Sequence, residues 1–378
     1  MYKILEIGMT RNIGGMETYI MEQYRHLNRD IIRYDFANLT GEYSMAFEDE
    51  IRNNGDVIYN IISRKKNILK HYYKWFVFFK KYHNVYDAVV LNTCDLYHMC
   101  PLFFAKLWGI KTIIIHSHNN GSEKKEGFLR KILISFNKIL MKYSVSNYWA
   151  CSKIAGEWMF GKKVFFEIIH NAIDTKKYIY NERIRKKIRN DLKIEDDFVL
   201  GHVGRFSYQK NHKFIITIFN YLLKKIPNAK LLLIGDYKLN KNYTNEVNIL
   251  IKKYNIKNKI LFLGSKKDIA EYYQAMDCFI LPSHFEGLGI VGIEAQAASL
   301  PCIVSTGVSK ELGITDLVKY ISLNENIDIW INEILNSKLN KRRDRYKDIV
   351  NAGYDIEEEI KEIQMHFIKN IENNKRRS

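Results

Sequence analysis

The sequence contains only four prolines among 378 residues, which argues against long proline-rich linkers. It has no run of 18 or more uncharged apolar residues, so no membrane-spanning helix is expected. Residues 1–8 are interrupted by Lys3 and Glu6, and they lack the apolar core and cleavage site of a signal peptide. We therefore expect these residues to form a buried first strand and the protein to remain in the cytoplasm.

Cysteine is scarce and scattered, with five residues, an odd number, and no Cys-x-x-Cys pair. This pattern is typical of a reducing compartment and excludes a disulfide framework and a structural zinc site. The cysteines are Cys94, Cys100, Cys151, Cys278 and Cys302.

Acidic residues are outnumbered, 42 against 59 lysines and arginines, which gives a formal net charge of +17. A basic surface attracts nucleic acid, anionic lipid or anionic small substrates. Lysines and arginines mix with aromatic and aliphatic residues in two segments, 64–81 and 124–142. Each segment fits either a helix lying in a membrane interface or an amphipathic helix packed on a sheet with a solvated basic face.

The chain length suits two domains, and 47% apolar residues can supply two cores. Short apolar runs alternate with amphipathic segments, which predicts parallel sheets with crossover helices. The alternation restarts after residue 195, so a second doubly wound domain is expected. Predicted strands are 2–7, 88–91, 112–115, 148–150, 165–169, 198–203, 230–234, 260–263, 278–281 and 301–304. Predicted helices are 16–27, 69–81, 97–108, 211–225, 245–254, 269–275 and 292–298, with further helix from 327 to about 371 and a frayed basic tail at 373–378.

The predicted strand 278–281 leads into a glycine-containing loop and a helix that should begin near Ile290. Gly287 and Gly289 let backbone N–H groups approach a ligand, and a helix N-terminus favours an anion such as a pyrophosphate. Glu286 lies in the loop, and Glu294 lies about one turn into the helix. Two carboxylates at this spacing suit two ends of one polyhydroxylated ligand, a sugar and a ribose.

Another strand, 198–203, runs into Gly204, with Arg205 and Lys210 in the loop that follows. Two cations at a strand end are suited to neutralise the charge that grows on a departing diphosphate. A third loop, after the first strand, contains Gly14, Gly15 and Glu17. It departs from the dinucleotide-binding pattern of spaced glycines and does not predict a nicotinamide site.

Two histidines, His116 and His118, lie at the end of the predicted strand 112–115, where ligands of parallel sheets bind. They could also serve as metal ligands. However, the sequence has no Asp-x-Asp motif, and the paired cations already suit a pyrophosphate. We therefore expect neither a metal nor a cofactor.

Together these motifs resemble the retaining GT-B glycosyltransferases of family 4, also called group 1, including those of capsule and exopolysaccharide assembly. The pattern is Glu286-x7-Glu294 followed by Pro301, with supporting matches at 150–153, 170–174, 235–236, 262–265 and 351–355. Ala172 stands where the family usually has glycine, and Leu288 where it often has phenylalanine. The likeness covers nearly the whole chain and is strongest over residues 201–305.

The resemblance implies an α/β architecture of two Rossmann-like doubly wound parallel-sheet domains facing a central cleft. It places an acceptor-side domain at 1–175, a nucleotide-sugar donor domain at 176–355, and a C-terminal helix and basic tail at 356–378, returning toward the N-terminal domain. Implied catalytic residues are His116, Glu286, Arg205 and Lys210, with His118 an alternative to His116. Implied substrate-binding residues are Gly14, Gly15, Glu17, His118, Gly204, Ser265, Gly287, Leu288, Gly289, Ile290 and Glu294.

The implied activity is metal-independent transfer of a sugar from a nucleoside diphosphate sugar, expected to be a UDP-sugar, with retention of configuration. The acceptor would be a glycan or a polyprenyl-diphosphate-linked sugar of bacterial surface polysaccharide synthesis. An acceptor in lipid would bring the protein to the inner face of the cell membrane as a peripheral protein, held by anionic lipid.

Two other functions fit parts of the sequence. A nucleotide-sugar epimerase shares the architecture but needs no acceptor, so donor conversion without acceptor would identify it. A non-enzymatic nucleic-acid-binding protein would explain the net charge. It would leave Glu286 and Glu294 unexplained, and the sequence contains no recognised nucleic-acid-binding module.

Overall fold

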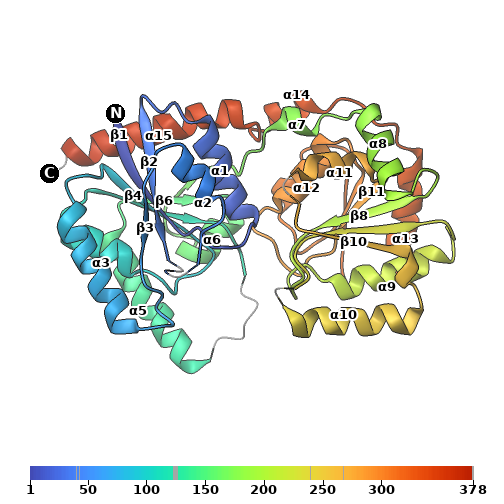
Figure 1. The fold of residues 1–378 in the computed structure, drawn as a ribbon, viewed down its shortest axis with the longest axis horizontal. Helices are drawn as coiled ribbons and strands as arrows, with labels where there is room; N and C mark the ends of the chain where they lie inside the picture. Colours follow the sequence, from blue (N-terminus) through green and yellow to red (C-terminus); the bar gives the residue numbers. More distant parts are fainter. Residues whose placement is uncertain (40, 42, 122–126, 239, 267, 377–378) are drawn as a thin grey trace. The chain divides into compact units, whose positions relative to one another are not determined.

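The computed structural model describes residues 1–39, 41, 43–121, 127–238, 240–266 and 268–376. The chain divides into two compact units (Figure 1). Unit 1 comprises Met1–Asn171 together with Ile356–Ser378, and unit 2 comprises Ala172–Asp355. Within the described ranges, no helix is both long enough and apolar enough to cross a bilayer.

Unit 1 is built on a parallel sheet of seven strands among the described residues, in the order β3-β2-β1-β4-β5-β6-β7. Its strands are β1 (Tyr2–Ile7), β2 (Ile32–Asn38), β3 (Ile58–Asn60), β4 (Ala88–Thr93), β5 (Thr112–Ser117), β6 (Asn147–Ala150) and β7 (Glu167–Ile168). Its helices are α1 (Gly15–His26), α2 (Glu48–Asn53), α3 (Ile68–Tyr82), α4 (Cys100–Leu107), α5 (Phe128–Ser144), α6 (Lys153–Phe160) and α15 (Ile356–Arg376).

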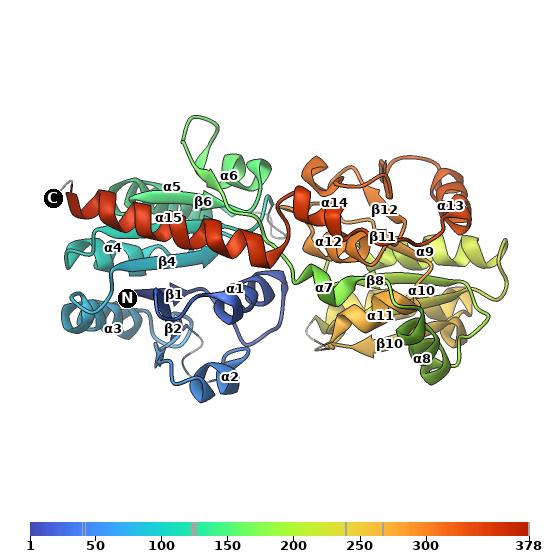
Figure 2. The same cartoon turned by 90° about the horizontal axis from the view of Figure 1, so that it is seen from above.

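Helices cover both faces of this sheet, because successive side chains of a strand point to opposite faces. Leu5 and Ile7 of β1 belong to the core packed by α3, α4 and α6. Ile4 belongs to the other core, which is closed by α1 and α15. Figure 2 shows α15 running along the sheet of unit 1. Its buried residues recur at helical spacing: Ile360, Ile363, Phe367 and Ile371.

Unit 2 contains a parallel sheet of six strands among its described residues, in the order β10-β9-β8-β11-β12-β13. Its strands are β8 (Val199–Val203), β9 (Lys230–Ile234), β10 (Ile260–Gly264), β11 (Cys278–Leu281), β12 (Cys302–Ser305) and β13 (Val318–Ile321). Its α-helices are α7 (Thr175–Tyr178), α8 (Glu182–Leu192), α9 (His212–Leu223), α10 (Lys241–Tyr254), α11 (Ile269–Ala275), α12 (Ile290–Ala297), α13 (Ile327–Asn336) and α14 (Tyr346–Asn351). Short 3₁₀ helices lie at Lys257–Lys259, Lys310–Leu312 and Ser337–Leu339.

Both sheets reverse their strand order once. In unit 1 the reversal lies between β1 and β4, and in unit 2 it lies between β8 and β11. In open parallel sheets, ligands bind beyond the carboxyl ends of the strands at such a reversal. The loops after these four strands are therefore the first places to look for a site.

The predicted elements differ from the structure in several places. Strands β2, β3 and β13 were missed, and the predicted strand 165–169 was too long, since β7 has only two residues. The predicted frayed tail at 373–378 was wrong for its described part. Helix α15 continues to Arg376, where Lys375 Nζ pairs with Asp87 Oδ1 at 3.0 Å, and residues 377 and 378 lie outside the described ranges.

Candidate active site

The loop after β8 and the loop after β11 are joined by hydrogen bonds in unit 2. The backbone N–H of His284 donates to the carbonyl of Gln209 at 2.8 Å, and Gln209 Nε2 donates to the carbonyl of Phe285 at 3.0 Å. Asn211 Nδ2 donates to the carbonyl of Pro282 at 3.2 Å. These bonds hold the two loops together next to the point where the strand order of the sheet reverses.

This arrangement brings together two of the predicted catalytic residues. Lys210 Nζ lies 2.6 Å from Glu286 Oε1, and both side chains are largely buried. The same carboxylate oxygen accepts a hydrogen bond from Ser283 Oγ at 3.0 Å. The sequence analysis missed Ser283, although its position three residues before Glu286 is a usable signal. An ammonium and a carboxylate are thus fixed together at one sheet edge.

Arg205, the other predicted cation, is exposed just beyond β8. It makes no ion pair with the residues that the structure describes. Gly204, which precedes it, is approached closely by the end of β9. An added Cβ at Gly235 would lie 2.1 Å from the carbonyl oxygen of Gly204, and Gly235 has a φ of +146°. Only glycine fits at position 235. The close contact therefore fixes the backbone position of Gly204, where the loop that carries Arg205 and Lys210 begins.

Helix α12 begins at Ile290, as the sequence predicted, after Gly289 in the left-handed conformation. Glu286 and Leu288 are buried in the preceding loop, and Gly287 lies between them. Glu294 is buried in the helix and accepts a hydrogen bond from Tyr273 Oη at 2.7 Å. Tyr273, on α11, is a further residue that the sequence analysis missed. Ser265 is exposed after β10, in the neighbourhood of a different strand end.

In unit 1, a hydrogen bond joins the beginning of the predicted glycine loop to the first turn of the helix that follows it. Thr10 Oγ1 donates to Glu17 Oε1 at 2.7 Å, and Glu17 is buried in the first turn of α1. An added Cβ at Gly14 would lie 2.9 Å from Glu17 Oε2, so a glycine at this position leaves room for the carboxylate. Gly14 and Gly15 themselves have ordinary backbone angles and form the start of α1.

The two predicted histidines differ in accessibility. His116 lies inside β5, only 1% exposed, between Tyr19 of α1 and Trp149 of β6. His118 follows the strand and is half-buried, and the centroids of its ring and of the His116 ring are 4.0 Å apart. Burial lowers the pKa of His116 well below its usual value and the pKa of His118 to about 3. Both imidazoles are therefore neutral at physiological pH.

His118 is the end of a chain of hydrogen bonds that crosses the strand reversal. Its Nε2 lies 3.0 Å from Asn92 Oδ1 on β4, and Asn92 Nδ2 donates to Glu6 Oε2 on β1 at 2.6 Å. Burial raises the pKa of Glu6 to about 8 against the opposing effect of the Asn92 hydrogen bond. The sequence analysis missed Glu6 and Asn92, although a carboxylate inside an apolar strand is itself a signal.

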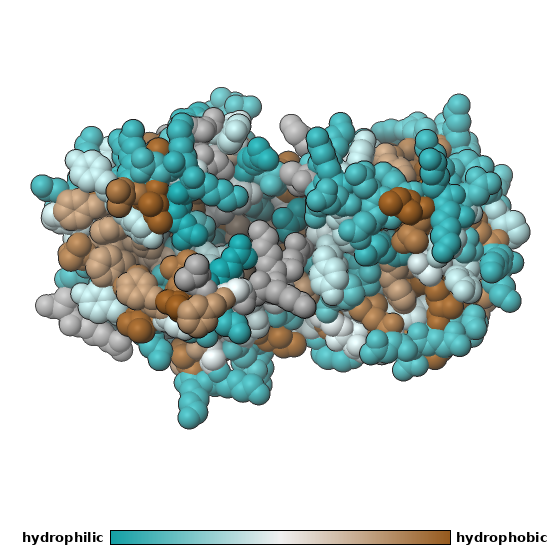
Figure 3. Space-filling view, turned by 90° about the horizontal axis from the view of Figure 1, so that it is seen from below, coloured by the Kyte–Doolittle hydropathy of each residue, from teal (hydrophilic) through white to brown (hydrophobic). Residues whose placement is uncertain are grey.

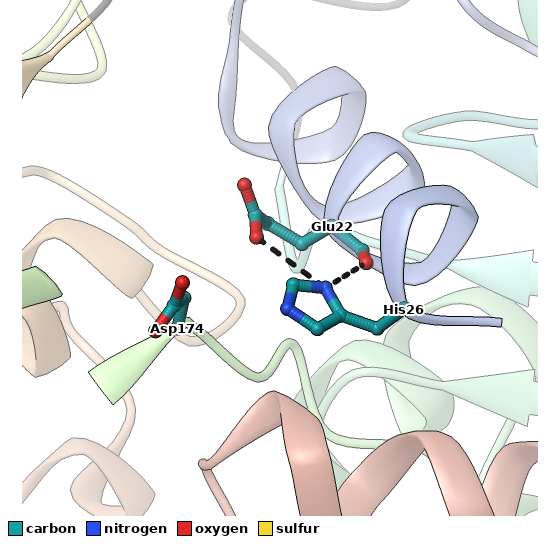
Figure 4. Close-up of side chains that lie close together, drawn as sticks. All are labelled: Glu22, His26 and Asp174. Atoms are coloured by element: carbon teal, nitrogen blue, oxygen red, sulfur yellow. Dashed lines mark hydrogen bonds and ion pairs between the residues drawn. The ribbon is translucent and has the colours of Figure 1, made fainter. Parts of the chain in front are cut away.

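Helix α1 also carries a histidine–carboxylate pair that could suggest a metal ligand set (Figure 4). His26 Nδ1 lies 2.8 Å from the backbone oxygen of Glu22 and 3.8 Å from its carboxylate. The same glutamate pairs with Arg25 at 2.8 Å. Within unit 1 these residues offer two ligand atoms, fewer than a zinc site takes from a protein, and the backbone contact accounts for the histidine.

Comparison with known proteins shows which family part of the chain matches. Residues 184–353 match the model for glycosyl transferases group 1, and these residues include Arg205, Lys210, Glu286 and Glu294. Over 95% of its length, the chain is 27% identical to the glycosyltransferase EpsF of Bacillus subtilis, of which it covers 94%.

The chain is a glycosyltransferase with a group 1 domain at residues 184–353.

The chain is also similar to two further glycosyltransferases. It is 31% identical to the capsular polysaccharide glycosyltransferase CapM of Staphylococcus aureus, over 43% of this chain and 44% of CapM. It is 30% identical, over 55% of this chain and 54% of the relative, to an Escherichia coli enzyme named UDP-Gal:alpha-D-GlcNAc-diphosphoundecaprenol alpha-1,3-galactosyltransferase.

Its fold is GT-B, as predicted. The structure of Anabaena HepE, solved in complex with UDP-glucose, superposes with a TM-score of 0.75 and 18% identity, covering 100% of this chain and 99% of HepE. WaaG, a glycosyltransferase of lipopolysaccharide biosynthesis, superposes with a TM-score of 0.70 and 16% identity, covering 96% of this chain and 98% of WaaG.

Proposed function

We propose that this glycosyltransferase moves a hexosyl group from a UDP-sugar to a hydroxyl of a glycan or lipid-linked acceptor in surface polysaccharide synthesis. The observation that carries the proposal is the buried Lys210–Glu286 pair at the strand reversal of unit 2, next to the N-terminus of α12. A cation and helix N–H groups suit a diphosphate, while the carboxylate suits sugar hydroxyls. The UDP-glucose bound to HepE and the UDP-Gal in the name of the Escherichia coli relative support UDP.

The proposed reaction retains the configuration of the anomeric carbon and uses no enzyme nucleophile. The bond between the anomeric carbon and the β-phosphate oxygen breaks, and the acceptor oxygen forms its bond to that carbon on the same face. The acceptor proton passes to the departing phosphate oxygen. Lys210 and Arg205 stabilise the negative charge of the leaving diphosphate. Glu286 is assigned to the donor sugar, and Glu294 to the ribose. We assign no step to a metal ion or cofactor.

A screen for nucleotide binding tests the donor site. We expect UDP and UDP-sugars to raise the unfolding temperature more than GDP, ADP or CMP do, because a ligand that binds only the folded state stabilises it. Glu294→Ala should abolish this stabilisation. Glu246→Ala is the matched control, since Glu246 pairs with Lys213 on an exposed helix surface, and it should keep the stabilisation. No stabilisation by any nucleotide would contradict the proposed site.

The proposed lipid-linked acceptor has a counterpart on the surface of unit 1. Helix α5 exposes one stripe of large apolar side chains, and these line an open groove. Figure 3 shows hydrophobic side chains gathered on this side of unit 1. The exposed residues of the stripe are Phe128, Ile132, Phe136, Ile139 and Tyr143, and the first four of them line the groove.

The positive charge beside the apolar stripe indicates which kind of surface the stripe binds. The sequence of α5 contains four cations and no aspartate or glutamate. The predicted basic segment 124–142 lies mostly on this helix, which spans Phe128–Ser144. Residues 124–126 of that segment lie outside the described ranges. A second copy of the chain would present the same positive charge and be repelled, whereas an anionic lipid surface is complementary. We therefore propose peripheral attachment through α5. Its cations are Arg130, Lys131, Lys138 and Lys142.

A further inference from the structure

The ion pair at the strand reversal of unit 2 joins the two charged groups that the proposed function assigns to different parts of the donor. Lys210 Nζ lies 2.6 Å from Glu286 Oε1, and the two side chains are only 14% and 9% exposed. Among the residues that the structure describes, neither group forms a second ion pair. A ligand that takes one partner therefore leaves the other charge buried and uncompensated.

The carboxylate of this pair is held in place from several sides. Ser283 Oγ donates to Glu286 Oε1 at 3.0 Å, the same oxygen that contacts the lysine. The backbone N–H of Glu286 donates to the carbonyl of Gly307 at 3.1 Å, and Ser305 Oγ donates to the carbonyl of Ser283. Glu286 therefore stays where it is when the flexible side chain of Lys210 turns toward another anion.

The other titratable groups beside the lysine are neutral. Burial lowers the pKa of His202 to about 3 and the pKa of His212 well below its usual value, and the charge of Lys210 acts in the same direction. An added Cβ at Gly204 would lie 3.0 Å from His202 Nε2 and 3.1 Å from Lys210 Cδ, so the lysine passes close to this ring. An incoming diphosphate must therefore compete with the carboxylate of Glu286 for the lysine.

A bare nucleoside diphosphate and a nucleoside diphosphate sugar affect this pair differently. Both have phosphate oxygens that can take Lys210 from Glu286. The bare diphosphate leaves the carboxylate without its cation and near a second negative charge, which costs free energy. A sugar brings hydroxyls that can donate to the carboxylate, and these hydrogen bonds offset the cost.

We propose that Glu286 competes with the bound diphosphate for Lys210, so that the site retains the sugar nucleotide and releases the bare nucleotide after transfer. The inference rests on the proposed function, which supplies the donor and its product. Once the sugar has left with the acceptor, the carboxylate has lost its hydroxyl donors, and re-forming the ion pair favours departure of the nucleotide. Glu286 then acts in product release as well as in sugar binding.

The test removes the charge of the competitor and keeps its shape. Glu286→Gln retains an oxygen that can accept from Ser283 but no longer forms an ion pair with Lys210. We expect UDP to bind about tenfold more tightly to this variant, which corresponds to one charge-assisted hydrogen bond, and UDP-glucose to bind more weakly. Titration calorimetry of the full-length protein measures both affinities.

Two comparisons separate competition for the lysine from other effects of the charge. Glu246→Gln is the matched control, because Glu246 pairs with Lys213 on an exposed surface, and it should leave both affinities unchanged. Lys210→Met removes the cation for which the two anions compete. In the Lys210→Met background, Glu286→Gln should not tighten UDP binding, since the two substitutions are coupled through the pair.

Tighter UDP binding by Glu286→Gln that is absent without Lys210 is the expected result. Unchanged or weaker UDP binding by Glu286→Gln would overturn the inference, and the proposed function would stand. Tighter binding that persists in the Lys210→Met background would also overturn it, because the carboxylate would then act by direct repulsion of the phosphates. If the wild type binds neither UDP nor UDP-glucose, the proposed function itself is rejected, and the inference with it.

Discussion

Lys210 Nζ lies 2.6 Å from Glu286 Oε1, so the loops after β8 and β11 share one buried ion pair. Each partner satisfies the other in the absence of substrate. A bound nucleoside diphosphate sugar would offer both groups new partners, a phosphate for the lysine and a hydroxyl for the glutamate. The pair therefore keeps two charged groups in place until the donor arrives.

Removing the lysine should impair both turnover and stability. Lys210→Ala takes away a fixed cation from the leaving diphosphate and should lower kcat by roughly 10²–10³-fold. It also leaves Glu286 buried without its cation, which should cost about 3 kcal/mol of unfolding free energy. Steady-state kinetics and urea unfolding measure the two effects. Lys213→Ala, whose partner Glu246 is exposed, should change neither, and near-normal turnover of Lys210→Ala would remove the catalytic assignment.

The hydrogen bond between Tyr273 and Glu294 gives a second prediction. Tyr273→Phe deletes the hydroxyl that donates to the buried carboxylate at 2.7 Å and also lies 3.1 Å from the carbonyl oxygen of Val291. We expect a loss of about 1–3 kcal/mol of unfolding free energy, because the buried carboxylate loses a donor. Nucleotide affinity should fall as well if Glu294 holds the ribose. Unchanged binding, measured by calorimetry, would separate Glu294 from the ligand.

The close approach at Gly235 can be tested by adding one methyl group. Gly235→Ala places a Cβ 2.1 Å from the carbonyl of Gly204, at a φ that side chains rarely adopt. It should destabilise unit 2 by about 2 kcal/mol or more and displace the loop that carries Arg205. Gly127→Ala is the control, since nothing lies within 4 Å of its added Cβ and its φ is negative. Equal unfolding temperatures for the two variants would show that the loop can adapt.

The buried Glu6 should make stability depend on pH. Its pKa is raised from 4.5 to about 8, mainly by burial, so the folded protein holds a proton that the unfolded chain releases above pH 4.5. Its contribution to stability is full below that pH and is lost as the pH rises to about 8, by roughly 3–5 kcal/mol. Glu6→Gln should flatten this slope in urea unfolding series. Glu358→Gln, on the exposed side of α15, should leave the slope as it is, and a slope unaffected by Glu6→Gln would contradict the pKa.

Attachment to a membrane is tested with vesicles of phosphatidylcholine, with and without phosphatidylglycerol. The wild type should sediment only with the anionic vesicles, and less so in high salt, because salt screens the lysines of α5. Replacing both Phe136 and Ile139 by serine should reduce binding at least about tenfold, because these side chains no longer insert into lipid. Met365→Ser, an exposed apolar residue on α15, should bind as the wild type does. Sedimentation with neither type of vesicle would refute attachment through α5.

Much of the fold could be predicted because buried parallel strands are continuous apolar runs. Strands β1, β9 and β11 and helix α11 have the bounds that the sequence predicted. Strand β2 was missed because Arg33 and Asp35 interrupt its apolar pattern. Asp35 is nevertheless buried, since it accepts from Tyr86 and from the backbone of Val57 and pairs with Lys3. Strands β3 and β13 were missed because they are short edge strands.

For the site, the motifs located the loops but not the contacts within them. Spacing placed Lys210 and Glu286 after two different strands, and only the strand order brings them together. The pairing of Glu294 with Tyr273 depends on how α11 packs beside α12, which no local pattern encodes. The roles assigned to these residues and to His118 stay predictions until the variants are measured.

The chain passes from unit 1 to unit 2 after Asn171 and returns at Ile356. Unit 2 is therefore one continuous segment inserted into unit 1, whose core lacks Ile360, Ile363 and Phe367 until α15 is made. During synthesis, unit 2 has its complete sequence outside the ribosome before unit 1 has its own. Until α15 is made, one face of the N-terminal sheet is partly uncovered. We therefore expect unit 2 to complete its folding on the ribosome before unit 1 does, although unit 1 comes first in the sequence.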